Sequence, residues 1–171
     1  NKMNRAMVRR VSAGLADYVL AEVPDAATRG IVVGFDGRIG SAEFAADTAA
    51  VIAARGVRVY LHDALCPTPQ LAHAVVFLGA AAGVMVTASH NPPQDNGYKV
   101  YWGNGAQIIP PHDRGISAAF DALTATPDAP TGGDVRPVPP EVLATYLDEV
   151  MALRVHEVTG VRVVYTAMHG V

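Results

Sequence analysis

The stretch GVMVTASHNPPQDNGYKVYWGNG, residues 83–105, decides how this chain folds. It begins with the short, largely apolar run 83–87, which is typical of a buried strand. Asn91 then precedes a proline, a position that disfavours helical backbone, so the chain is expected to turn there. Residues 98–102 and 106–109 flank Gly-Asn-Gly, which is typical of a β-hairpin. The stretch therefore predicts a buried strand, a polar loop and an antiparallel hairpin at the edge of a sheet.

Short apolar runs alternate with helical patterns on the N-terminal side of that stretch. The expected strands are residues 31–35 and 57–61. The expected helices are residues 4–22, 41–55 and 68–78, with Ser41 and Thr68 as the N-caps of the last two. This alternation predicts an α/β fold, namely a three-layer αβα domain with a mainly parallel mixed sheet and an antiparallel edge hairpin. Ligands of such sheets bind at the carboxyl ends of the strands.

The pattern changes again in the second half of the chain. A helix is expected to follow the two prolines at 110–111, and residues 124–140 are rich in Pro, Gly, Thr and Asp, as linkers are. A further helix is expected from Pro140, and a strand at residues 161–165. The predicted divisions are a first domain at 1–125, a linker at 126–140, and a linking helix with the first strand of a second domain at 141–171. We expect the chain to be the N-terminal part of a longer protein.

The bulk composition narrows the class of protein. Hydrophobic residues make up 50% and charged residues 17% of the chain, which is a globular composition. The net charge of −3 provides no broad basic field, so nucleic acid is not an expected partner. The most apolar segment, residues 74–86, is too short for a membrane span of roughly 18 residues. Cys66 is the only cysteine, which excludes an intrachain disulfide and fits a cytoplasmic location.

Three polar side chains in and after the predicted loop suggest phosphoryl chemistry. Ser89 follows the buried strand among small residues, with His90 beside it, and Lys99 returns on the next strand. A phosphoserine carries roughly −1.5 to −2 charge and requires such donors. The same residues also fit a polar turn in which His90 and Asn91 only satisfy backbone groups. On the residues alone, both interpretations stay open.

The string TASHNPPQDNGYK at residues 87–99 resembles the phosphoserine loop of the α-D-phosphohexomutase superfamily. That superfamily includes phosphoglucomutases, phosphomannomutases and related phosphopentomutases. GFDGR at residues 34–38, PTP at 67–69 and YTAMHGV at 165–171 are similar to further motifs of the superfamily. The resemblance therefore extends over almost the whole chain, and it implies domain I of such an enzyme followed by the entry into domain II.

The resemblance implies an enzyme that interconverts sugar 1- and 6-phosphates of glucose or mannose through a bisphosphate. Ser89 would donate and accept the phosphoryl group, His90 would lie beside it, and Lys99 would assist proton transfer or stabilise charge. Arg38 and Asn91 would contact the sugar phosphate substrate, although Arg38 fits a structural ion pair equally well. The implied cofactors are a sugar 1,6-bisphosphate activator and Mg²⁺, bound by the phosphate of Ser89 and by an Asp-x-Asp-x-Asp loop that this sequence does not contain.

Three alternative hypotheses remain. A serine hydrolase would use Ser89 with a histidine, but the chain lacks the G-x-S-x-G elbow, and His90, as the adjacent residue, is poorly placed to orient on the serine hydroxyl. A non-catalytic protein would keep the fold and the phosphorylated serine without completing a cleft. A phosphopentomutase is the third hypothesis, because the loop motif does not select the sugar.

Overall fold

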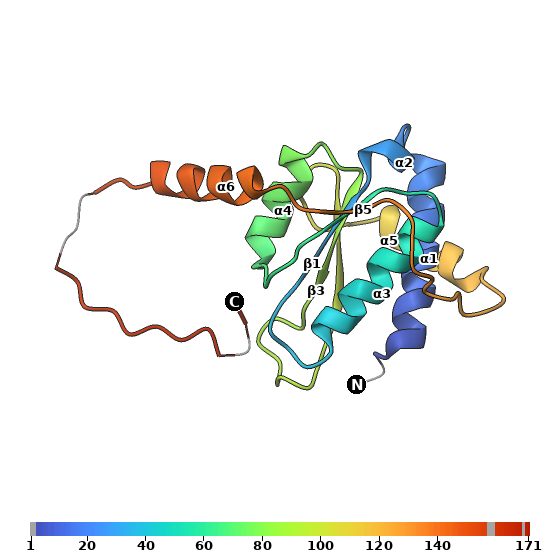
Figure 1. Cartoon of the computed structure of the whole chain (residues 1–171), viewed down its shortest axis with the longest axis horizontal. Helices are drawn as coiled ribbons and strands as arrows, with labels where there is room; N and C mark the ends of the chain where they lie inside the picture. The colour runs from blue at the N-terminus through green and yellow to red at the C-terminus, as the bar shows by residue number, and fades with distance from the viewer. Residues whose placement is uncertain (1–2, 157–159, 169) are drawn as a thin grey trace.

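The computed structural model describes residues 3–156, 160–168 and 170–171 (Figure 1). The helices are α1 (Arg5–Glu22), α2 (Ala26–Arg29), α3 (Ser41–Ala54), α4 (Thr68–Phe77), α5 (His112–Asp121) and α6 (Pro140–Ala152). The strands are β1 (Ile31–Phe35), β2 (Val59–Leu61), β3 (Ala82–Val86), β4 (Tyr98–Trp102) and β5 (Val135–Pro137). The order confirms the predicted alternation of strands and helices over the first 86 residues.

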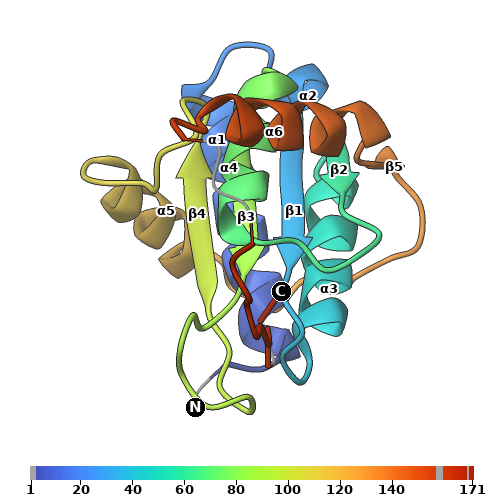
Figure 2. The same ribbon diagram turned by 90° about the vertical axis from the view of Figure 1, so that its left-hand side faces the viewer.

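The strands form one mixed sheet in the order β4-β3-β1-β2-β5, which Figure 2 shows side by side. β1 lies between β2 and β3 and is parallel to both, and β5 is parallel to β2. β4 pairs with β3 in the antiparallel sense, with Val86 opposite Tyr98. The predicted α/β fold, with a mainly parallel sheet and an antiparallel edge, is therefore confirmed.

Helices cover both faces of the sheet and close two apolar cores. Helices α1, α3 and α5 pack on one face, and α4 and α6 pack on the other (Figures 1 and 2). Successive strand residues point to opposite faces, so neighbours in β3 serve different cores: Val84 packs with the first group and Met85 with the α4 side. The carboxyl ends of the central strands β1 and β3 are not covered by these helices, and a site can form there.

Two predicted helix caps are wrong. Gly40 and Pro67 occupy the N-cap positions of α3 and α4, and neither helix has a side-chain cap hydrogen bond. Ser41 is the first residue of α3, and its hydroxyl donates to the Asp36 carboxylate rather than accepting from a backbone N–H of the first turn. Thr68 likewise lies inside the first turn of α4. In both cases the helix begins one residue earlier than the cap pattern suggests.

Four other details differ from expectation. The short helix α2 is an element that the sequence pattern does not reveal. The second arm of the predicted hairpin is reduced to one isolated bridge, between Tyr101 and Gln107. Within the segment expected to be a linker, β5 adds a fifth strand, and its proline is tolerated because the strand lies at the sheet edge. Residues 161–165 form no strand, since no strand of the described chain pairs with them.

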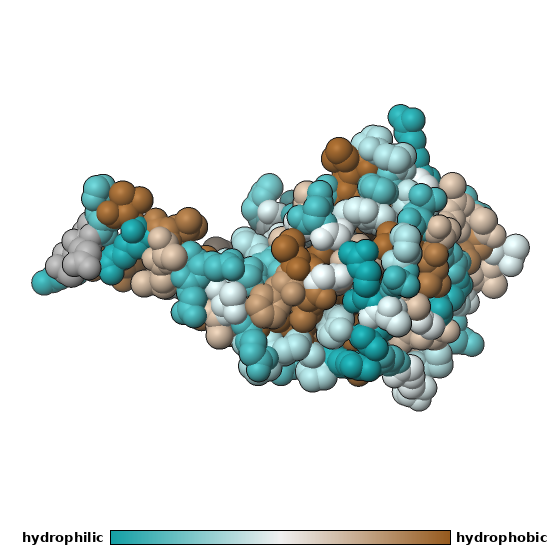
Figure 3. All heavy atoms as spheres, turned by 90° about the horizontal axis from the view of Figure 1, so that it is seen from above, coloured by the Kyte–Doolittle hydropathy of each residue, from teal (hydrophilic) through white to brown (hydrophobic). Residues whose placement is uncertain are grey.

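The end of α6 and residues 153–156 and 160–168 extend away from the body of the protein (Figures 1 and 3). Apolar side chains lie exposed there among polar ones, as the brown spheres of Figure 3 show. The most exposed of them are Leu153, Val155, Val163, Val164 and Met168. Among the residues that the structure describes, no helix is both long and apolar enough to cross a membrane.

Candidate functional site

Ser89 lies in an open cavity of about 360 Å³ at the carboxyl ends of β1 and β3. The residues that line the cavity are Asp36, Cys66, Pro67, Thr68, Pro69, Met85, Thr87, Ser89, His90, Gly170 and Val171. The first turn of the ten-residue helix α4 forms one wall. Its positive dipole end favours negative charge, so a phosphoryl group on Ser89 would be stabilised there.

The backbone of Ser89 adopts a conformation that non-glycine residues rarely take. Its φ angle is +56°, in the left-handed region, while its side chain stays exposed. The backbone N–H of Ser89 donates to Thr87 Oγ1 at 3.0 Å. Such strained residues persist only where the surrounding structure holds them, and they concentrate at functional sites. The loop therefore requires supporting contacts, and it has them.

Asp36 is the centre of that support. It directly follows β1, as Thr87 directly follows β3, and the register pairs the preceding residues, Phe35 and Val86. The two polar side chains therefore meet, and Thr87 Oγ1 donates to Asp36 Oδ2 at 2.6 Å. The Asp36 carboxylate also accepts from Ser41 Oγ at 2.8 Å. This carboxylate is 5% exposed, so its hydrogen bonds form away from competing water.

Arg38 ties Asp36 to the loop. Its Nε donates to Asp36 Oδ2 at 3.0 Å, and its side chain has no exposed surface. Its terminal nitrogens donate to the carbonyl oxygens of four loop residues: Ser89, Asn91, Pro92 and Asp95. A planar guanidinium has five donors in a fixed fork and is suited to such a cluster of acceptors. Arg38 thus clamps the backbone from Ser89 to Asp95.

Asn96 and Gly97 close the other end of the loop. Asn96 Nδ2 donates to Ser41 Oγ at 2.8 Å, and its Oδ1 accepts from the backbone N–H of Gly97 at 2.9 Å. A Cβ atom at Gly97 would lie 2.5 Å from the carbonyl oxygen of Thr87, which is too close for any side chain. Glycine at this position lets the two ends of the loop approach each other, with Thr87 N–H donating to Gly97 O at 3.1 Å.

The five residues predicted for the site occupy three kinds of position. Ser89 and His90 are exposed and line the same cavity. Asn91 contributes its carbonyl oxygen to the Arg38 clamp, and its side chain is exposed. The guanidinium of Arg38 is buried and already donates to Asp36 and to the loop carbonyls. This arrangement favours a structural ion pair over a contact with substrate. Lys99 lies on β4 opposite Met85, on the cavity side of the sheet, but is not among the residues that line the cavity.

The roles expected of these residues stay predictions, and the sequence interpretation missed their supports. Asp36, Thr87, Ser41 and Asn96 hold the loop, and the sequence pattern assigns none of them to that role. The signal for Asp36 and Thr87 was available, because each is a polar residue directly after a buried strand.

The expected Mg²⁺ has no preformed cluster of side-chain ligands among the residues that the structure describes. Within residues 3–156, 160–168 and 170–171, no three His, Cys, Asp or Glu side chains are grouped to hold a metal. Asp36 lines the cavity, but its carboxylate already accepts from Arg38, Ser41 and Thr87. A phosphoryl group on Ser89 would bring oxygen atoms, which Mg²⁺ prefers as ligands. The described chain thus fits one part of a magnesium site.

Cys66 and a second cavity are both unsuited to phosphoryl transfer. Burial raises the pKa of the Cys66 thiol to about 12, so this side chain at the cavity wall is not a thiolate nucleophile.

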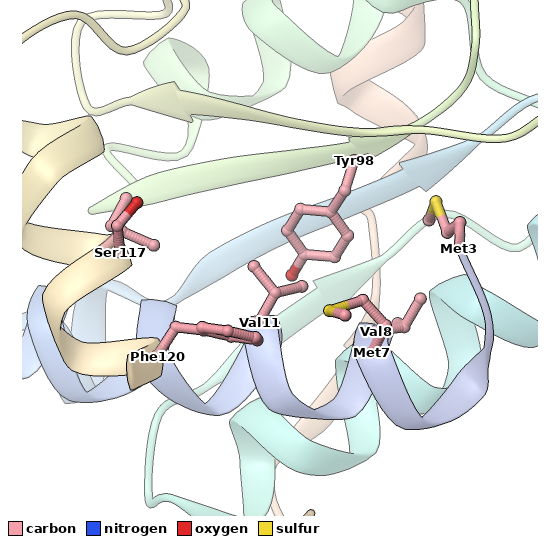
Figure 4. A pocket seen from close by; sticks show the side chains of 8 residues that line it. Met3, Met7, Val8, Val11, Tyr98, Ser117 and Phe120 are labelled. Atoms are coloured by element: carbon pink, nitrogen blue, oxygen red, sulfur yellow. The ribbon is translucent and has the colours of Figure 1, made fainter. Parts of the chain in front are cut away.

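A second cavity of about 360 Å³ lies between α1, α5 and β4 (Figure 4). Its lining is mostly apolar, with Met7, Val11 and Phe120 around the ring of Tyr98. A charged sugar phosphate would find few polar partners there.

Comparisons with known proteins place this chain in one family. Residues 1–127 match the family model described as phosphoglucomutase/phosphomannomutase, alpha/beta/alpha domain I. A probable phosphomannomutase of Haemophilus influenzae is 42% identical over 99% of this chain and 35% of its own length. A probable phosphoribomutase of Schizosaccharomyces pombe is 53% identical over 70% of this chain and 20% of its own length.

A solved structure extends the comparison to three dimensions. The crystal structure of a putative phosphomannomutase from Thermus thermophilus superposes with a TM-score of 0.76 at 27% identity, over 89% of this chain and 32% of that one. The chain therefore spans about a third or less of the length of these relatives.

Proposed function

The chain belongs to the phosphoglucomutase/phosphomannomutase family, and from that premise we propose that its protein is a sugar phosphomutase in which Ser89 carries the transferred phosphoryl group. The observation that supports this proposal most is the placement of Ser89. An exposed hydroxyl lies at the carboxyl end of a buried strand, beside the N-terminus of α4, in a loop clamped by a fully buried arginine. Phosphoryl transfer depends mainly on positioning and on charge stabilisation, and this loop provides both.

The proposed reaction has two transfers. A free hydroxyl of the sugar monophosphate attacks the phosphorus of phosphorylated Ser89, the bond from phosphorus to Oγ breaks, and the sugar becomes a bisphosphate. After the bisphosphate reorients, Ser89 Oγ attacks its other phosphoryl group, which returns Ser89 to the phosphorylated form and releases the isomer. Lys99 is proposed to assist the proton transfer or to stabilise the phosphoryl oxygens, and His90 to lie beside them.

Mg²⁺ is proposed to neutralise charge on the phosphoryl group when bound. The only ligand that we assign to it in this chain is the phosphate of Ser89. The contribution of the chain itself is to hold that group still. Arg38 binds the carbonyl oxygens of the loop, and the positive end of the α4 dipole is proposed to stabilise the phosphoryl oxygens.

The substrate is proposed to be a glucose or mannose phosphate, with a pentose phosphate as a second candidate. The phosphomannomutase relative, which matches along almost the whole chain, favours the hexose. The higher identity to the phosphoribomutase relative, over a shorter region, favours the pentose. Ser89 and its loop would serve either sugar, because the transferred group is the same. Turnover of mannose 1-phosphate, glucose 1-phosphate and ribose 1-phosphate, compared by kcat/KM, would separate the two.

The proposal is tested by locating the phosphoryl group. The protein is incubated with glucose 1,6-bisphosphate, mannose 1,6-bisphosphate or ribose 1,5-bisphosphate, and its peptides are examined by mass spectrometry. We expect phosphate on Ser89, and none on the loop of the Ser89→Ala variant. Ser117→Ala is the matched control, because Ser117 is an exposed serine on α5 and should leave labelling unchanged. Phosphate on another residue, or none with any of the three donors, would overturn the proposal.

A further inference from the structure

Thr87 lies between the sheet and Ser89, and its side chain has no part in the two transfers proposed above. It directly follows β3, and it is 4% exposed although it lines the cavity. Its hydroxyl makes two hydrogen bonds, one to Asp36 Oδ2 at 2.6 Å and one from the backbone N–H of Ser89 at 3.0 Å. One buried oxygen therefore connects an acidic side chain to the backbone of the phosphoryl carrier.

The direction of these two hydrogen bonds is fixed by chemistry. A carboxylate has only acceptor atoms, so the hydroxyl proton of Thr87 must point to Asp36. The lone pairs of Thr87 Oγ1 are then left to accept from the N–H of Ser89. Hydrogen bonds with an ionised partner are shorter and stronger than neutral ones, which agrees with the 2.6 Å distance. Asp36 thus orients the hydroxyl that holds Ser89.

The two sides of Ser89 are held by different residues. Thr87 Oγ1 accepts from the backbone N–H of Ser89, and Arg38 donates to the backbone carbonyl oxygen of Ser89. The N–H belongs to the peptide plane before Ser89 and the carbonyl to the plane after it, so the two bonds together fix the backbone angles between the planes. Without a partner for the N–H, the first plane could reorient and Ser89 could leave the left-handed region, which is unfavourable for any residue with a Cβ. Such a reorientation would also displace the serine side chain from its place in the cavity. The turn bond from the N–H of Asn91 to Ala88 O and the Arg38 clamp hold the chain after Ser89, and Thr87 holds the peptide plane before it.

We propose that Thr87 is a positioning residue for phosphoryl transfer: its hydroxyl, oriented by Asp36, holds the backbone of Ser89 in the left-handed conformation that presents the side chain to the cavity. This inference rests on the proposed function of Ser89. Thr87 itself makes no contact with the transferred group in this account. Its effect should therefore appear in the rate of transfer rather than in the binding of the sugar.

The test compares two substitutions at Thr87. Thr87→Val keeps the shape of the side chain but removes the hydroxyl, and Thr87→Ser keeps the hydroxyl. We expect Thr87→Val to lower kcat about 10- to 100-fold, because small displacements of a reacting group have effects of that size. KM for the sugar phosphate should change little, and Thr87→Ser should recover most of the activity. Thr48→Val is the matched control, since it removes another buried hydroxyl, in the middle of α3, that accepts from Ser12 Oγ rather than from the Ser89 loop, and it should leave kcat close to wild type.

A second measurement covers the case in which Thr87→Val does not fold. Amide hydrogen exchange of the wild-type chain should show the N–H of Ser89 protected, although the residue is exposed. An unprotected Ser89 amide would overturn the proposal, as would a folded Thr87→Val variant with wild-type kcat, or a loss that Thr87→Ser does not recover. Failure of the proposed function would look different, because wild-type protein would then carry no phosphate on Ser89 with any of the sugar bisphosphates.

Discussion

Replacing Arg38 with methionine should destabilise the protein more than any exposed ion-pair mutation. The guanidinium is fully buried, donates to Asp36 and binds four carbonyl oxygens of the Ser89 loop. Methionine fills similar space but leaves the buried Asp36 carboxylate without its counter-charge. Removing one partner of a buried ion pair costs about 3–5 kcal/mol. For a chain of this length, each kcal/mol lowers Tm by about 2–4 °C, so we expect a decrease of roughly 6–20 °C.

Thermal unfolding followed by circular dichroism measures this effect. Arg136→Met is the matched control, because Arg136 is 52% exposed and its ion pair with Asp134 is at the surface. Exposed pairs contribute about 0–1 kcal/mol, so the control should lower Tm by at most a few degrees. Arg38→Lys should fall between the two, since an ammonium keeps the charge but has only three donors for five acceptor groups. A decrease for Arg38→Met no larger than that for Arg136→Met would refute the clamp.

Three further predictions concern other parts of the protein. Hydrogen bonds from Arg5 hold the pKa of Asp47 below its ordinary 3.8, so Asp47 stabilises the fold above that pH and the contribution is lost as pH falls through the lower value of the folded state; urea unfolding should show Asp47→Asn less stable than wild type at pH 7, with a difference that narrows progressively as pH falls below 3.8. Buried Cys66, with its pKa raised to about 12, should react with iodoacetamide at pH 8 only after denaturation, and rapid alkylation of the native chain would contradict its burial. Gly97→Ala should lower Tm and slow phosphorylation of Ser89, because the new Cβ would lie 2.5 Å from the carbonyl oxygen of Thr87, and an unchanged Tm would show that the loop ends are not in contact.

The sheet and its antiparallel edge could be predicted from the sequence because each signal was local. The run at 83–87 is largely apolar, and the turn residues after it fix where the strand ends. Strand β5 could not be predicted in the same way. Val135–Pro137 is short, exposed and contains a proline, and its strand character comes from pairing with β2, which is distant in sequence. Residues 161–165 show the reverse case, in which a strand-like sequence has no partner strand among the described residues.

In the candidate site, too, the local features could be predicted from the sequence and the long-range contacts could not. Ser89 and His90 lie together in the cavity because they are neighbours in a recognisable loop. The support of that loop depends on the register between β1 and β3, which brings Asp36 against Thr87 from 51 residues away. A single sequence contains no signal for that register. The sequence also leaves two roles possible for Arg38. An arginine in a turn fits an ion pair with Asp36 and a contact with substrate equally well, and only the three-dimensional contacts distinguish them.

The most direct test of the central claim follows the phosphoryl group from Ser89 to sugar. Protein labelled on Ser89 with a ³²P-bearing sugar bisphosphate is freed of excess donor and mixed with unlabelled sugar monophosphate in a rapid-quench apparatus. We expect the label to leave Ser89 and to appear in a sugar bisphosphate at a rate no slower than turnover. Label that stays on Ser89 while the sugar phosphate is isomerised, or isomerisation by the Ser89→Ala variant at the wild-type rate, would contradict the account.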